Sequence, residues 1–183
     1  MKFYDIKNPI GLYLFMKENI KYGFYSTYDN DTHRRVDMND DMLYELLLFH
    51  SYYLQSPKEL LISKHGICFD QVEFERDWFV KKGYEVYTFF TPHHNHCFLV
   101  FKDSNGYNWF ERTIKELNGI HTKKSLEELI YYYKYVQDNM NLKLYEYDNV
   151  TFGETFCDFL DEVTEKDQLG LKLMKRLADG YKK

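Results

Sequence analysis

The chain has few prolines, few glycines and no long apolar run. Its 183 residues include three prolines and nine glycines, which leaves no obvious linker, so we expect a single domain over residues 1–183. No stretch approaches the ~20 apolar residues of a membrane span. The N-terminal residues also lack the unbroken apolar segment and cleavage site of a signal peptide. We therefore expect a cytoplasmic protein without a membrane partner.

Basic runs and a disulfide framework are missing as well. Lysine and arginine never run longer than a pair and the formal net charge is −5, which argues against a nucleic-acid partner. The three cysteines, Cys68, Cys97 and Cys157, are an odd number without framework spacing. Aromatic residues, in contrast, make up 19% of the chain, with 18 tyrosines and 15 phenylalanines. They must supply much of the core.

Helical patterns flank a central group of strand patterns. Apolar spacing and capping residues predict helices over 9–22, 38–54 (capped by Asn39 or Asp40), 68–82, 125–138 and 154–177, and a short helix from Pro57 (capped by Ser56) that ends, with any turn after it, by Gly66. Runs rich in β-branched and aromatic residues predict strands over 84–90, 96–102, 107–113 and 142–148. Because the two kinds of element are segregated, the order predicts an α+β fold with an antiparallel sheet and additional N- and C-terminal helices.

Cys68 lies at the start of the predicted helix 68–82, in the stretch ISKHGICFDQVEFERDWF (residues 62–79). A helix N-terminus lowers the pKa of a thiol, and the thiolate is the nucleophilic form. Gly66, two residues earlier, allows the backbone to approach a substrate carbonyl and leaves N–H groups for an oxyanion. Taken alone, the position of Cys68 favours a small buried apolar residue over a nucleophile.

A nucleophilic cysteine needs a base and an orienting acid, and two strands supply candidates. His96 begins one predicted strand, Glu111 ends the next, and any even-length loop puts both on one face. A four-residue loop over 102–105 would set them directly opposite each other. A two-residue turn at Asn105 and Gly106 would displace them too far along the strands. The geometry therefore requires that this Asn-Gly pair does not close the hairpin.

The segments GICFD, NHCFLVF and YNWFE follow one another in an order that resembles the transglutaminase-like superfamily of papain-like cysteine enzymes. The resemblance covers a core of about residues 57–115, with helical regions 1–55 and 116–183 beside it. It implies a nucleophile helix packed on an antiparallel sheet, with Cys68 as nucleophile, His96 as general base and Glu111 as orienting acid. The chain departs from the family pattern at Glu111, where Asp is more frequent, and at Phe69, where Trp is common.

The chemistry implied is acyl transfer from an amide through a thioester on Cys68, with a peptide, a protein or a small amide as substrate. We expect no cofactor and no metal. Gln55, Gly66 and Trp109 are the further candidates for substrate binding or oxyanion stabilisation. Two alternatives remain: a non-catalytic binding module on the same fold, and a zinc site built on the segment His93–Cys97. In the second, His94 and His96 would share a strand face, with His65, His121 or Cys157 completing the ligand set.

Overall fold

The computed structural model describes residues 3–26, 31–33, 41–148, 150–155 and 157–160. The helices are α1 (Pro9–Asn19), α2 (Asp41–Ser51), α3 (Pro57–Ser63), α4 (Cys68–Lys81) and α5 (Leu126–Val136), with 3-10 turns η1 (Phe3–Asp5), η3 (His93–Asn95) and η4 (Lys115–Leu117). The strands are β1 (Lys21–Tyr22), β2 (Phe24–Ser26), β3 (Asp31–His33), β4 (His65–Gly66), β5 (Glu85–Thr91), β6 (His96–Asp103), β7 (Gly106–Glu111), β8 (Gly119–Lys123) and β9 (Tyr145–Tyr147).

The prediction of an α+β fold with an antiparallel sheet is confirmed. Five strands pair in the order β8-β7-β6-β5-β9, and every neighbouring pair is antiparallel. The strands β5 to β8 form a meander, and β9 returns after α5 to pair with the other edge of β5. The sequence pattern did not indicate β8, because its run GIHTK lies among polar residues and lacks a clear alternation.

Local signals account for the bounds of α3, α4 and α5. Ser56 caps α3 and forms a reciprocal capping box with Glu59, and Pro57 occupies the first helical position. Gly83, with φ of 81°, follows the end of α4 in the left-handed region that glycine tolerates. Ser125 caps α5 by accepting a hydrogen bond from the Glu128 N–H. The start predicted for the second helix, Asn39 or Asp40, and most of the helix predicted over 154–177 lie outside the described residues.

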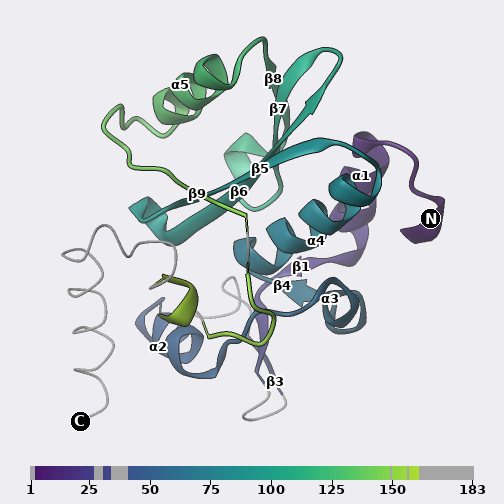
Figure 1. Cartoon of the computed structure of the whole chain (residues 1–183). Helices are drawn as coiled ribbons and strands as arrows, with labels where there is room; N and C mark the ends of the chain where they lie inside the picture. Colours follow the sequence, from purple (N-terminus) through teal and green to yellow (C-terminus); the bar gives the residue numbers. More distant parts are fainter. Residues whose placement is uncertain (1–2, 27–30, 34–40, 149, 156, 161–183) are drawn as a thin grey trace.

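The sheet lies between two unequal layers (Figure 1). The helix α4 packs against β5 and β6 on one face, together with the N-terminal elements, and α5 covers β7 and β8 on the other. The alternation of β6 divides the core accordingly: Cys97, Leu99 and Phe101 belong to the α4 cluster, whereas Phe98 and Val100 belong to the α5 cluster.

The region before residue 55, predicted as helical, also contains short strands. β2 and β3 form an antiparallel pair, and β1 pairs in parallel with β4, with Lys21 opposite His65 and Tyr22 opposite Gly66. Runs of two or three residues are too short for a period to show in the sequence. The β1–β4 pair anchors the segment that leads into α4. Within the described ranges, no helix is long and apolar enough to cross a bilayer.

Candidate active site

Cys68 is the first residue of α4, directly after the N-cap residue Ile67. Its side chain is 3% exposed, and its Sγ atom lies 3.7 Å from the carbonyl oxygen of Asn95, to which the thiol donates. Asn95 ends η3 and immediately precedes His96. The sulfur therefore lies where α4 meets the beginning of β6. The first-turn N–H groups there have no intrahelical acceptor and favour an anion.

Asp70 holds the beginning of α4 in place. Its Oδ2 accepts a hydrogen bond from the Ile67 N–H at 2.9 Å, and its Oδ1 accepts from the Tyr52 hydroxyl and the Gln55 N–H, each at 3.0 Å. Burial raises the pKa of Asp70 to about 7, although the hydrogen bonds from Gln55, Ile67 and Tyr52 oppose this. One carboxyl thus ties the turn before Cys68 to a segment that precedes α3. Sequence reasoning missed this role, because Asp70 also fits a plain first-turn acid.

Gly66 is required by packing at this turn. A Cβ atom at Gly66 would lie 2.7 Å from Leu60 Cδ1 and 2.8 Å from Asp70 Cβ, so a side chain would collide with both. The Gly66 carbonyl accepts a hydrogen bond from Gln71 Nε2 at 2.8 Å. The glycine lets the segment before Cys68 pass between α3 and α4. Its proposed closeness to a substrate carbonyl stays a prediction.

His96 and Glu111 are in direct contact. The His96 Nε2 and Glu111 Oε2 atoms are 3.0 Å apart, and the two side chains are 9% and 1% exposed. The pair spans two neighbouring strands, because His96 begins β6 and Glu111 ends β7. With Nε2 engaged by the acid, Nδ1 is the ring nitrogen left for Cys68, and interaction with Cys68 is among the causes that raise the pKa of His96.

The hairpin between β6 and β7 meets the geometric requirement. Asp103 pairs with Gly106, so the turn residues are Ser104 and Asn105, and the prediction that Asn105 and Gly106 do not close the turn is confirmed. The loop has two residues, not the four that would set His96 and Glu111 directly opposite each other. The observed register sets His96 diagonally rather than directly opposite Glu111, a separation that two long side chains on one face can bridge.

Glu111 is held by more donors than His96 alone. Its Oε2 accepts from the Trp109 indole N–H at 3.2 Å. Its Oε1 accepts from the Thr113 N–H at 2.7 Å, the Thr113 hydroxyl at 3.0 Å and the Ile114 N–H at 2.9 Å. Burial opposes ionisation, but the charge of His96 and these hydrogen bonds hold the pKa of Glu111 below its ordinary value. The acid is therefore a fixed carboxylate behind the imidazole.

The charges of the three residues favour an ion pair. The Cys97 thiol, by a hydrogen bond, and His96, by a hydrogen bond and its charge, hold the pKa of Cys68 well below its ordinary value against the opposing effect of burial. Burial lowers the pKa of His96, but the Glu111 charge and the hydrogen bonds with Cys68 and Glu111 raise it to about 10. At neutral pH the arrangement favours a thiolate at Cys68 beside an imidazolium at His96.

Further acids are buried along α4, and sequence reasoning did not find them as part of the site. Glu75 is 2% exposed, and burial followed by the Glu111 charge raises the pKa of Glu75 well above its ordinary value. Glu73 is 4% exposed and its pKa is raised to about 7, chiefly by burial. The signal available in the sequence was the density of acids within the first two turns, which a solvated helix face explains as well.

The other predicted site residues have structural partners. The side chain of Gln55 donates from Nε2 to the His65 carbonyl at 2.9 Å and accepts from the Ser63 hydroxyl at 2.6 Å. Trp109 is fully buried and donates to Glu111. The contacts of Gln55 brace the turn before Cys68, and that of Trp109 orients the acid. The oxyanion or substrate roles predicted for both stay predictions.

Metal ligation finds no support in the part of the chain that the structure describes. No group of three or more His, Cys, Asp or Glu side chains in the described residues is arranged to hold an ion. The side chain of His94, which the zinc hypothesis needs, lies outside the described residues. The Nε2 atom of His96 is engaged by Glu111.

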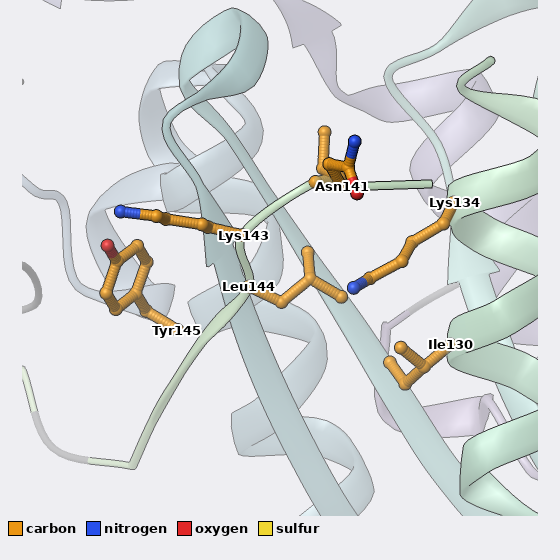
Figure 2. Close-up of a pocket in the computed structure, with 7 residues that line it drawn as sticks. Ile130, Lys134, Asn141, Lys143, Leu144 and Tyr145 are labelled. Atoms are coloured by element: carbon orange, nitrogen blue, oxygen red, sulfur yellow. The ribbon is translucent and has the colours of Figure 1, made fainter. Parts of the chain in front are cut away.

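A surface cavity of about 560 Å³ lies apart from these residues, between α5 and the segment that leads into β9. Figure 2 shows Ile130 and Lys134 of α5 on one side of it and Leu144 on the other. None of the predicted site residues lines this cavity, and its lining contains no cysteine, serine, threonine or acidic side chain. It therefore adds nothing to the chemistry at Cys68.

No protein-family model matches this sequence, and no curated protein is significantly similar to it.

Proposed function

We propose that the protein is a thiol-dependent acyl-transfer enzyme of papain-like, transglutaminase-like architecture, with Cys68 as nucleophile, His96 as general acid and base, and Glu111 as orienting acid. The observation that carries the proposal is the buried 3.0 Å contact between His96 and Glu111, with the sulfur of Cys68, at a helix N-terminus, 3.7 Å from the carbonyl oxygen of Asn95, the residue before His96. A nucleophile, a base and an oriented acid in this sequence are the parts that covalent acyl transfer needs.

The reaction begins with attack of the Cys68 thiolate on an amide carbonyl carbon. A C–S bond forms and the carbonyl oxygen becomes an oxyanion, which we place against the first-turn N–H groups of α4. The imidazolium of His96 then protonates the leaving nitrogen as the C–N bond breaks, leaving an acyl-thioester. Water or an amine attacks the thioester while His96 accepts its proton, and Cys68 is released as a thiolate.

Two features of the site suit this sequence of steps. Glu111 is fixed by four donors besides His96, so the imidazole keeps one tautomer while it gains and loses a proton. Cys68, His96 and Glu111 are all less than a tenth exposed, and low local dielectric strengthens the attraction between thiolate and imidazolium. The substrate class is an amide of a peptide, a protein or a small molecule.

The test is the selective reactivity of Cys68 toward iodoacetamide, followed by peptide mass spectrometry, together with acyl-enzyme formation from an activated ester such as p-nitrophenyl acetate. We expect Cys68 to react at neutral pH far faster than Cys97 or Cys157, and to carry the acyl group. The variant Glu111→Gln should slow both reactions at least tenfold, because His96 loses the charge that keeps it protonated.

The matched control is Cys157→Ser, which should leave both reactions of Cys68 unchanged. In Cys68→Ala, the fast labelling and the acyl adduct should both disappear. Equal and slow labelling of all three cysteines would overturn the enzyme proposal and favour a binding module on this fold. Stoichiometric zinc lost on substitution of His96 would instead favour the metal site.

A further inference from the structure

The cavity beside α5 has the size and the lining of a ligand site. Its volume of about 560 Å³ lies within the range of roughly 300–1,000 Å³ that is typical of small-molecule sites. Four of its seven lining residues are apolar or aromatic: Ile130 of α5, and Leu142, Leu144 and Tyr145 of the segment that leads into β9. These walls suit an apolar group better than a few water molecules, which need several polar partners.

The backbone on both sides of the cavity is fixed. After α5 the chain reverses through hydrogen bonds from the Asn139 N–H to the Lys134 carbonyl, at 3.0 Å, and from the Leu142 N–H to the Asn139 carbonyl, at 3.1 Å. Leu142 is then buried in the α5 cluster, and Tyr145 pairs with Phe90 of β5. The cavity is therefore preformed and needs no loop to close around a ligand.

Lys134 brings a positive charge to these apolar walls. Its side chain is half-buried, and Figure 2 shows it extending from α5 toward Leu144. Among the residues that the structure describes, no acidic side chain forms an ion pair with Lys134, and none lines the cavity. The chain as a whole has a net charge of −5, so a cation without an acidic partner is a local exception. Attraction of an anion to this amine is stronger beside apolar walls than in bulk water.

We propose that this cavity is a binding site for an aliphatic carboxylate, with the apolar chain between Ile130 and Leu144 and the carboxylate on the amine of Lys134. A free alkanoic acid and a peptide that ends in an aliphatic residue both have this chemistry. The site is separate from Cys68. Tyr145 pairs with Phe90, which pairs with Cys97 on β6, so two strand spacings, or about 10 Å, separate the cavity wall from β6.

The charge of the lining favours a carboxylate over a phosphate. Lys143 also lines the cavity, but Figure 2 shows its side chain extending away from α5. One ammonium group therefore faces the apolar walls, and it matches the single charge of a carboxylate. A phosphate ester carries nearly two charges and three acceptor oxygens, and arginine with its several donors suits it better. The amide of Asn141 is the remaining polar group of the lining.

The experiment is calorimetric titration of the full-length protein with decanoate below its micelle-forming concentration. Decanol and decylammonium, which have the same chain, are titrated in parallel. We expect one saturable site for decanoate, weaker binding of decanol and the weakest binding of decylammonium. In Lys134→Met, which keeps the aliphatic stem, decanoate should bind at least about fivefold more weakly because a charge-assisted hydrogen bond is lost. Decanol binding should stay unchanged.

A second pair of probes distinguishes the sources of the carboxylate. N-acetyl-leucyl-leucine is titrated beside its C-terminal amide, which lacks the charge. If the dipeptide acid binds more tightly than decanoate, the ligand is the end of a peptide, and the reverse order indicates a free alkanoic acid. In either case the acid should bind more tightly than its uncharged counterpart.

Lys143→Met and Lys17→Met are the matched controls, because each removes one lysine charge, from the side chain that extends away from α5 and from the exposed face of α1. Both should change decanoate affinity by less than about twofold, since exposed charges are screened by salt. Thermal unfolding shows whether each variant is folded, and Lys134→Gln replaces Lys134→Met if the latter is not.

Three results would overturn the proposed carboxylate site: no saturable binding of decanoate, equal losses in Lys134→Met and a control, or protection of Cys68 from iodoacetamide by saturating decanoate. The last result would place the ligand at Cys68 instead. None of them bears on the relative reactivity of the three cysteines without ligand, so the proposed function is tested separately.

Discussion

The helices on the two faces of the sheet differ in how they meet the core. α5 is an ordinary amphipathic helix, with Leu129 and Tyr133 buried against the sheet and Tyr131 and Tyr135 exposed. α4 is buried on all sides from Cys68 through Glu75, and that stretch includes Asp70, Gln71 and Glu73. Buried acids cost free energy unless they are paired or neutral. The difference indicates that α5 covers the sheet, whereas α4 gives up stability to build a polar site.

We expect the largest effect from removing Asp70, the acid that positions the beginning of α4. In Asp70→Ala, the Tyr52 hydroxyl and the Gln55 and Ile67 N–H groups lose their acceptor in the interior. We expect the free energy of unfolding to fall by at least about 3 kcal/mol, since each unsatisfied buried donor costs about 1–3 kcal/mol. Urea denaturation measures this change.

The control is Asp77→Ala on the same helix, whose carboxylate forms an exposed 2.7 Å ion pair with Lys81. That pair should contribute less than about 1 kcal/mol. If Asp70→Ala lost no more stability than Asp77→Ala, Asp70 would not hold the beginning of α4.

A smaller expected effect is the pH dependence of stability that the buried acids of α4 cause. Burial raises the pKa of Glu73 to about 7, against the lowering effect of Arg76, and Glu154 adds to the rise. Between about pH 4.3 and 7 the folded state keeps a proton that the unfolded state has released, so stability falls as pH rises. Asp70, also near 7, adds to the fall in the same window.

We therefore expect Glu73→Gln to flatten the decline of unfolding free energy by up to about 1.4 kcal/mol per pH unit, the contribution of one proton. Arg76→Gln should have the opposite consequence and extend the decline to higher pH, because Glu73 loses the cation 3.5 Å away. Urea denaturation at several pH values checks both. Parallel profiles for Glu73→Gln and the unmodified protein would contradict a raised pKa at Glu73.

The smallest effect belongs to the outer face of α5. Tyr131 and Tyr135 are 63% and 66% exposed. Replacing either by serine should change the free energy of unfolding by no more than about 0.5 kcal/mol, because little of either side chain is buried. A much larger loss in either variant would show that α5 is more than a cover for the sheet.

The sequence predicted what local signals encode. The caps at Ser56 and Ser125 located α3 and α5, and the alternation in HCFLVFK located β6. A loop of even length between β6 and β7 was enough to predict that His96 and Glu111 lie on one face of the hairpin. The sequence did not predict contacts between distant segments. The clamp of Asp70 on Tyr52 spans 18 residues and has no periodic signature. The register of β6 on β7 depended on which residues form the turn, and the approach of Cys68 to the Asn95 carbonyl depended on how α4 packs on β6.

The separations along the chain also set an order of assembly. His96 and Glu111 are 15 residues apart within one hairpin, so base and acid can meet early, as local contacts do. The turn before Cys68 is complete only when Tyr52 reaches Asp70 and β1 has paired with β4 across α2 and α3. The surroundings of Cys68 are thus among the last features to form. Rapid alkylation of Cys68 during refolding would therefore show that the N-terminal segment has packed against α4. In a nascent chain, Cys68 would not be alkylated rapidly until then.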